Sequence, residues 1–124
     1  MVDFEYLSLL AISLDESSLN FGLIEPGSSS EIKTVNVVNR GNVNVDLEMY
    51  GSDLENENNN INVNSIKFKY NETWNNLNYR PSLFDFNLES GLNKNKQLEF
   101  RLDLPSLILP NKYTGKINLV GIEE

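Results

Sequence analysis

Apolar and polar residues alternate along most of this chain, which is the pattern of a β-strand with one buried and one solvent-facing side. In residues 98–104, leucine and phenylalanine occupy every second position, and charged residues occupy the positions between them. Residues 43–49, 66–70 and 84–88 repeat this arrangement. These four segments exclude a helical bundle, so the sequence predicts an all-β protein.

Turn-forming residues separate the alternating segments. Pro26-Gly27 precedes a serine run, and Asn39-Arg40-Gly41-Asn42 lies between two valine-rich segments. The second of these predicts a hairpin, because Gly and Asn tolerate a positive φ. Ser90-Gly91 predicts a similar turn. The predicted strands are residues 4–14, 18–23, 31–39, 42–51, 63–70, 83–89, 96–104 and 113–122.

Seven to eight short strands in 124 residues predict a single domain, residues 1–124, with the architecture of an immunoglobulin-like antiparallel β-sandwich. A barrel is the alternative architecture. Two segments lack the alternation: residues 51–63 predict a polar surface loop, and residues 73–83 predict an irregular segment or a helical turn. Within 31–39 the alternation slips after Ile32, which predicts a β-bulge.

Composition limits the chemistry that the chain can perform. It has no cysteine and no histidine, so thiolate chemistry and the most common general base and transition-metal ligand are absent. The net charge is −8 and the basic residues are scattered singly, which disfavours nucleic acid and anionic membranes as partners.

The apolar segment Leu7–Leu14 is too short to span a bilayer, and acidic residues precede it, so it predicts a strand rather than a membrane anchor or signal peptide. Because no nucleophile–base pair, phosphate-binding loop or metal motif is present, we expect no enzyme activity and no cofactor.

The turns and the strands between them also form a motif. The motif consists of Phe-Gly, then Pro-Gly, then alternating valines that end in Asn-Arg-Gly-Asn-Val. Its residues are Phe21, Gly22, Pro26, Gly27, Val35, Val37, Asn39, Gly41, Asn42 and Val45. Gly-Ser-Asp-Leu follows at 51–54, and PNKYTGKI near the end contributes Pro110, Tyr113, Gly115 and Ile117. These residues resemble the motifs of immunoglobulin-like domains of archaeal and bacterial cell-surface proteins, which have Hydin-like relatives.

The resemblance implies a non-catalytic structural, adhesion or interaction module. Such a module would bind other protein subunits in a prokaryotic, for example archaeal, cell-surface or pilus-like assembly. The long first strand, residues 4–14, favours self-association by pairing of edge strands, although pairing within its own sandwich is the simpler role. Two alternatives remain open: a cytoplasmic scaffold domain that binds a protein partner, and a carbohydrate-binding sandwich.

Five apolar or aromatic residues are candidates for partner contact. Trp74 and Tyr79 lie in an Asn-rich segment and are candidate contacts for a protein or a glycan, while the structural alternative is that Trp74 covers the core beneath a loop. Leu107, Ile108 and Leu109 lie between two prolines and are a candidate exposed patch. The alternative is that they cover the open end of the sandwich.

Two further candidate sites are polar. Asp53, Glu55 and Glu57 alternate in the predicted loop and offer the hard oxygen ligands that Ca²⁺ prefers, although a solvated acidic loop is the favoured interpretation. Asn71 begins the sequon Asn-Glu-Thr and is a candidate glycosylation site if the chain is exported.

Overall fold

Strands are the main secondary structure of this chain in the computed structural model, which describes residues 2–3, 12–15, 18–70, 72–91, 94–108 and 112–124. The strands are β1 Val2–Asp3, β2 Ile12–Leu14, β3 Lys33–Asn39, β4 Val45–Gly51, β5 Leu54–Glu55, β6 Asn60–Ile61, β7 Ile66–Tyr70, β8 Thr73–Asn76, β9 Ser82–Leu88, β10 Asn95–Leu102 and β11 Ile117–Glu123. The 3₁₀ turn η1, Val63–Ser65, is the only helical element within these residues. The prediction of an all-β protein is confirmed.

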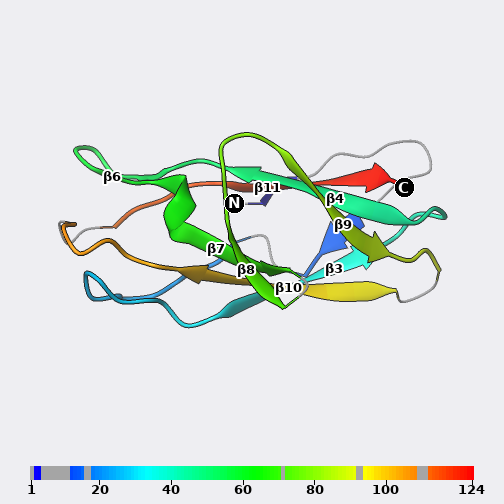
Figure 1. Cartoon of the computed structure of the whole chain (residues 1–124), viewed down its shortest axis with the longest axis horizontal. Coiled ribbons are helices and arrows are strands. Elements are labelled where there is room, and N and C mark those ends of the chain that lie inside the picture. Colours follow the sequence, from blue (N-terminus) through cyan, green and yellow to red (C-terminus); the bar gives the residue numbers. More distant parts are fainter. Residues whose placement is uncertain (1, 4–11, 16–17, 71, 92–93, 109–111) are drawn as a thin grey trace.

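The strands form two main sheets that lie one above the other (Figure 1). The four-stranded sheet has the order β1-β11-β4-β9, and the five-stranded sheet has the order β2-β3-β10-β7-β8. Neighbouring strands are antiparallel, except that β1 runs parallel to β11. The short strands β5 and β6 form a separate hairpin.

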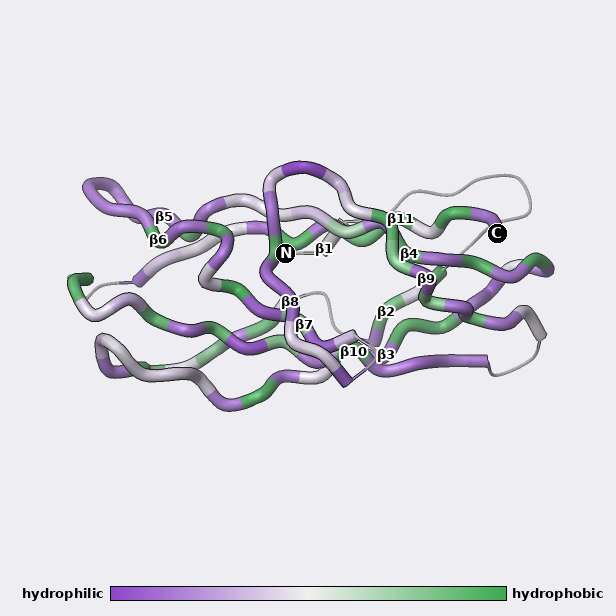
Figure 2. Tube along the Cα trace, in the orientation of Figure 1, coloured by the Kyte–Doolittle hydropathy of each residue, from purple (hydrophilic) through white to green (hydrophobic). Residues whose placement is uncertain are grey.

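One layer of apolar side chains fills the space between the two sheets. In β4, Val45, Leu47 and Met49 are buried, whereas the residues between them are partly exposed; β7, β10 and β11 alternate in the same way. Figure 2 shows this alternation as changes between green and purple along the strands. The rings of Phe68 in β7 and Phe84 in β9 meet edge to face with their centroids 4.9 Å apart, so the two sheets touch through this layer.

The segment Asn39-Arg40-Gly41-Asn42 connects the two sheets, and the prediction of a hairpin there is wrong. β3 pairs with β2 and β10, whereas β4 pairs with β11 and β9. The turn at Ser90-Gly91 likewise leads from β9 in the four-stranded sheet to β10 in the five-stranded sheet. Alternation alone does not distinguish the two arrangements, because strands of both sheets bury the same kind of face in the shared core.

Asn39 explains why the chain crosses between the sheets at this point. Its side chain is buried, with only 3% of the residue exposed. The amide nitrogen donates to the carbonyl oxygens of Val43 (2.8 Å) and Leu88 (3.1 Å), and the amide oxygen accepts from the backbone nitrogen of Gly41 (2.9 Å). These three backbone groups obtain from one side chain the partners that a hairpin ladder would otherwise supply.

Three other segments differ from the prediction. Residues 18–23 form no strand: Gly22 has a φ of +80°, which interrupts an extended strand, and Leu23 is fully exposed. Conversely, β8 occupies part of the segment 73–83 that was expected to be irregular or helical, and β5 and β6 lie within the expected loop 51–63.

The irregularity in pairing lies in β9, not in β3. β3 pairs with β2 and β10 in continuous register, and Ile32 simply precedes the strand and is half-exposed. The register shifts instead where β9 faces Val45 and Leu47 of β4. There Asn87 has a φ of +51°, and its backbone nitrogen donates to the carboxylate of Asp46 (3.0 Å). The predicted bulge in 31–39 is therefore wrong.

The turn at Pro26-Gly27 is confirmed. Gly27 has a φ of +80°, and the backbone nitrogen of Ser28 donates to the carbonyl oxygen of Glu25 (3.0 Å). The serine run that follows lies beside the end of β10, where the nitrogen of Ser30 donates to the carbonyl oxygen of Leu102 (2.8 Å).

Replacing Asn39 should destabilise the fold strongly. Asn39→Ala removes this side-chain partner from one buried and two partly buried backbone groups, so we expect the free energy of unfolding to fall by about 2–4 kcal/mol. Urea unfolding followed by circular dichroism measures this change. The matched control is Asn42→Ala, at an exposed position in the same connection, which should change stability by less than about 0.5 kcal/mol. Equal effects of the two substitutions would contradict the role assigned to Asn39.

Gly51, at the end of β4, should not tolerate a side chain. A Cβ there would lie 2.8 Å from the carbonyl oxygen of Lys116 and 2.5 Å from a methyl carbon of Leu77. We expect Gly51→Ala to lower the free energy of unfolding by about 2–3 kcal/mol, because the backbone at Lys116, just before β11, has to shift. Gly22→Ala is the comparison, because its Cβ would meet nothing within 4 Å and the cost, about 1–2 kcal/mol, comes from its positive φ alone. A smaller effect at Gly51 than at Gly22 in the same unfolding assay would refute the close approach.

Candidate functional site

Basic side chains and the only tryptophan of the chain gather on the outer face of the five-stranded sheet. Because Phe68 and Phe100 point into the core, their strand neighbours point outward. The pairing register places Arg101 of β10 opposite Lys67 of β7, and Lys69 of β7 opposite Trp74 of β8. We call Lys67, Lys69, Trp74 and Arg101 the basic–aromatic patch.

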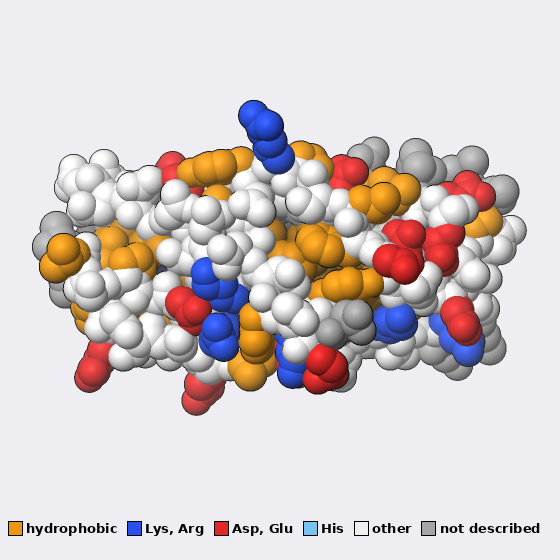
Figure 3. All heavy atoms as spheres, in the orientation of Figure 1, with side chains coloured by type: hydrophobic (Ala, Val, Ile, Leu, Met, Phe, Trp, Pro, Cys, Tyr) orange, Lys and Arg blue, Asp and Glu red, His pale blue; other side chains and the backbone are white. Residues whose placement is uncertain are grey.

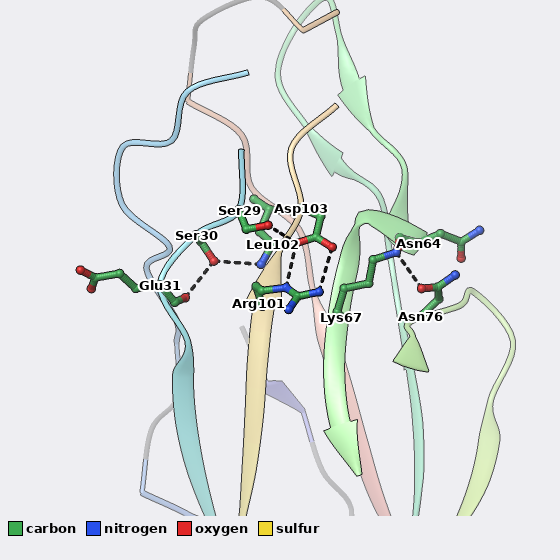
Figure 4. Close-up of polar contacts among 9 residues, drawn as sticks. All are labelled: Ser29, Ser30, Glu31, Asn64, Lys67, Asn76, Arg101, Leu102 and Asp103. Carbon is green, nitrogen blue, oxygen red and sulfur yellow. Dashed lines mark hydrogen bonds and ion pairs between the residues drawn. The ribbon is translucent and has the colours of Figure 1, made fainter. Parts of the chain in front are cut away.

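Arg101 is the most firmly held member of the patch. Its Nε and Nη2 donate to the two carboxylate oxygens of Asp103 at 2.8 and 3.1 Å (Figure 4). Its guanidinium also lies over the ring of Trp74, 4.5 Å from the centroid. A cation over an aromatic face and a two-point carboxylate contact are both favourable, and together they fix the orientation of Arg101.

Asp103 connects the patch to the serine run. Its Oδ1 accepts a hydrogen bond from the hydroxyl of Ser29 (2.7 Å), and Ser30 Oγ accepts one from the backbone nitrogen of Leu102 (2.9 Å), as Figure 4 shows. Burial alone would raise the pKa of Asp103, but hydrogen bonds from Ser29 and Arg101 outweigh it and hold the pKa below its ordinary value. The carboxylate is therefore ionised near neutral pH and balances part of the charge of Arg101.

The two lysines of the patch keep part of their charge accessible. Lys67 Nζ donates to the carbonyl oxygen of Asn64 and to Oδ1 of Asn76, both at 2.7 Å. Lys69 Nζ lies 3.7 Å from a carboxylate oxygen of Glu72 and 3.9 Å from one of Glu99, distances typical of weak surface ion pairs. A partner with carboxylates or carbonyl groups could replace these weak contacts.

The patch was not anticipated from the order of basic residues along the chain. Lys67, Lys69 and Arg101 are scattered singly in sequence, yet Figure 3 shows Lys and Arg side chains close together, with Asp and Glu side chains beside them, over the region of β7, β8 and β10. Alternation placed each of these residues on an outward face. The register between strands, which brings them together, is not encoded in any one segment.

Tyr79, the other aromatic candidate, makes a hydrogen bond that holds two segments of the fold together. Its hydroxyl donates to Oδ1 of Asp53 (2.7 Å), which also accepts from the backbone nitrogen of Val63 (2.8 Å). Oδ2 of Asp53 accepts from the amide of Asn60 (2.9 Å). The hydrogen bond from Tyr79 is the main cause that holds the pKa of Asp53 below its ordinary value. Asp53 thus links the β5–β6 hairpin to the segment before β9.

The predicted calcium ligands do not converge in the structure. Glu55 lies in β5, where its backbone pairs with Thr114, and Glu57 is exposed in the hairpin turn. Among the described residues, the acidic groups that converge are Asp46, Asp85 and Glu124, whose carboxylate oxygens lie within 4.8 Å of one another.

The remaining candidates are only partly described. Leu107 is almost fully exposed, and Ile108 packs against the core, whereas Leu109 lies outside the described residues. Asn71 also lies outside them, so its glycosylation stays a prediction. The predicted first strand 4–14 is described only from Ile12, where β2 pairs with β3 of its own sheet.

The two sheets end on the same side of the molecule in edge strands β8 and β9, which differ in accessibility. On β9, the hydroxyl of Tyr70 donates to the carbonyl oxygen of Asp85, and Lys96 Nζ donates to that of Phe86 (2.6 Å). Side chains of the opposite sheet therefore occupy part of the β9 edge, beside an open groove of about 300 Å³. On β8, next to the patch, the amide of Asn78 donates to the carbonyl oxygen of Asn76 over a longer distance (3.4 Å), which is a weaker contact for a partner strand to displace.

A scan of protein-family models and searches of curated proteins and solved structures found no match to this chain. The described residues include no helix with the length and hydrophobicity needed to cross a bilayer. The outer face of the five-stranded sheet offers cationic, amide and aromatic groups close together.

Removing the hydroxyl of Tyr79 should raise the pKa of Asp53 toward its ordinary value. Because the folded pKa is depressed, the ionised carboxylate stabilises the fold above its unfolded pKa, and this contribution is lost as the pH falls through the folded value. Tyr79→Phe should thus destabilise the protein at neutral pH and progressively less in acid. An NMR titration of the aspartate carboxyl carbons measures the pKa directly. The control is Tyr50→Phe, because the hydroxyl of Tyr50 does not donate to Asp53. An unchanged titration of Asp53 in Tyr79→Phe would refute the contact.

Proposed function

We propose that this chain is an immunoglobulin-like β-sandwich that acts as a non-catalytic interaction module and binds another protein subunit through the basic–aromatic patch. The observation that carries the proposal is the guanidinium of Arg101 held over Trp74 between two lysines, at the edge of a sheet. Tryptophan and arginine are the residues most enriched at the energetic centres of protein interfaces.

The side chain of Arg101 already has a fixed orientation in the free chain, and this favours binding. Arg101 is fixed by Asp103 and Trp74 before any partner arrives, so less side-chain entropy is lost on association. Lys67 donates to the neutral oxygens of Asn64 and Asn76, and the ion pairs of Lys69 with Glu72 and Glu99 are weak, so both lysines can turn to the carboxylates of a partner with a locally acidic surface. The β8 edge offers backbone groups for an extended segment beside the same side chains.

The strand order supports the immunoglobulin-like assignment. In the five-stranded sheet, β10 lies between β3 and β7, as strand E lies between strands B and D in the A-B-E-D sheet of immunoglobulin domains. The other sheet departs from that pattern, since β11 pairs directly with β4 and β9 forms its edge. The motif residues fit the assignment too, because Asn39 joins the two sheets and Gly51 and Gly115 lie at close backbone approaches.

The resemblance to surface domains supports a place in a prokaryotic cell-surface or pilus-like assembly, with a cytoplasmic scaffold as the alternative. For the carbohydrate-binding alternative the geometry is less favourable. Stacking of a sugar needs an open aromatic face, and Arg101 occupies one face of Trp74.

Site-specific photocrosslinking in cells of the native host tests this function. A crosslinking amino acid at Thr34, an exposed position on the same sheet face, should yield a covalent adduct with a defined protein. The same probe at Asn58, in the distant β5–β6 turn, is the matched control. We expect Lys69→Glu to reduce the Thr34 adduct at least about tenfold, because it reverses a charge at the centre of the patch. Absence of a protein adduct from Thr34, or an adduct insensitive to Lys69→Glu, would overturn the proposed function.

A further inference from the structure

The outer face of the four-stranded sheet has the opposite character to the basic–aromatic patch. Because Leu47 and Phe84 point into the core, Asp46 and Glu48 of β4 and Asp85 of β9 point outward. We call Asp46, Glu48, Asp85 and Glu124 the acidic face. Three of its carboxylates lie within 4.8 Å of one another.

Apolar side chains share the acidic face. Leu83 of β9 is 60% exposed and lies opposite Glu48, which in turn lies opposite Val120 of β11. Tyr50, Val120 and Ile122 are half-buried on the same side of the sheet. Apolar groups with a charged surround are characteristic of a surface that another protein covers.

The acidic face is poorly neutralised by the chain itself. Desolvation, followed by repulsion from Asp46 and Asp85, raises the pKa of Glu124, and Lys96 offsets this only in part. Cations supplied by another molecule would relieve the repulsion. The patch on the opposite sheet, with Lys67, Lys69 and Arg101, carries such cations around an aromatic ring.

We propose that copies of this chain stack head to tail, with the basic–aromatic patch of one copy against the acidic face of the next. This rests on the proposed function and names the partner subunit as a second copy. The two surfaces lie on the outer sides of two facing sheets, so each copy can use both at once. A contact between two different surfaces does not close on itself in a pair and extends into a linear array.

Charge complementarity favours a second copy over an unrelated partner. The patch carries three cations, of which Arg101 is paired with Asp103, and Lys69 lies 3.7 Å from Glu72 and 3.9 Å from Glu99 in weak pairs that a partner's carboxylates can replace. The acidic face carries four carboxylates, and both sets lie beside apolar or aromatic groups. The net charge of −8 opposes approach at long range, but at physiological ionic strength repulsion is screened beyond about 8 Å. At contact distance the facing opposite charges dominate.

Charge reversal on one face at a time tests this arrangement by sedimentation velocity of the purified chain. Lys67→Glu with Lys69→Glu reverses the patch, and Glu48→Lys with Asp85→Lys reverses the acidic face. Wild-type protein should form a concentration-dependent series of oligomers, and each reversed variant alone should stay monomeric. A mixture of the two variants should associate at least about tenfold more tightly than either alone, because the intact acidic face of one meets the intact patch of the other.

Matched controls keep the net charge changes equal. Arg80→Glu with Lys94→Glu and Glu25→Lys with Glu57→Lys reverse exposed charges away from both faces and should associate like wild type. Circular dichroism confirms folding, and single reversals at Lys69 and Asp85 replace any double variant that fails to fold. Wild-type protein that stays monomeric up to about 1 mM, or variants that do not associate when mixed, would overturn the stacking. A Thr34 adduct with a different protein would then leave the proposed function standing.

Discussion

The packing of both sheets against one shared layer of apolar side chains decides where the charged residues of this chain lie. Ile66 and Phe68 must face that layer, so Lys67 and Lys69 between them have to face solvent on the outer side of the five-stranded sheet. The same constraint turns Asp46 and Glu48 outward on the other sheet. A displacement of one residue in either register would bury these charges, which the free energy of folding does not allow. The separation of basic and acidic surfaces is thus a direct consequence of how the core is formed.

A single polar group lets the chain move between the two sheets without leaving backbone groups unpaired. Asn39 replaces part of a hairpin ladder with hydrogen bonds from its own amide, at the point where β3 ends. Because it also reaches the carbonyl oxygen of Leu88, it holds the end of β9 against the same connection. Buried amides of this kind are costly unless their donors and acceptors are used, and both ends of the Asn39 amide have partners here.

The sequence was informative wherever local physics decides the structure. Alternation identified β4, β7, β9 and β10, and the Pro26-Gly27 turn followed from backbone preferences. Sheet membership was not predictable, because a crossing and a hairpin have the same hydrophobic pattern and differ only in the contacts of Asn39. The basic–aromatic patch was not predictable for a related reason. The sequence indicates Trp74 as a candidate contact, but Arg101 lies 27 positions further along the chain and approaches it only through the register of β10, β7 and β8. Long-range register is set by the assembled core rather than by any single strand.

The residues of the patch also hold the edge strand beside them, and this links stability to binding. β8 has four residues, and its contacts with the rest of the sheet include Lys67 with Asn76 and Arg101 with Trp74. Short polar edge strands have little apolar burial to hold them, so such contacts contribute a large share of their local stability. A partner that binds the patch must therefore either preserve these contacts or replace them with its own. Binding there would change the local opening of β8, so hydrogen exchange at β8 and occupancy of the patch should be coupled in both directions.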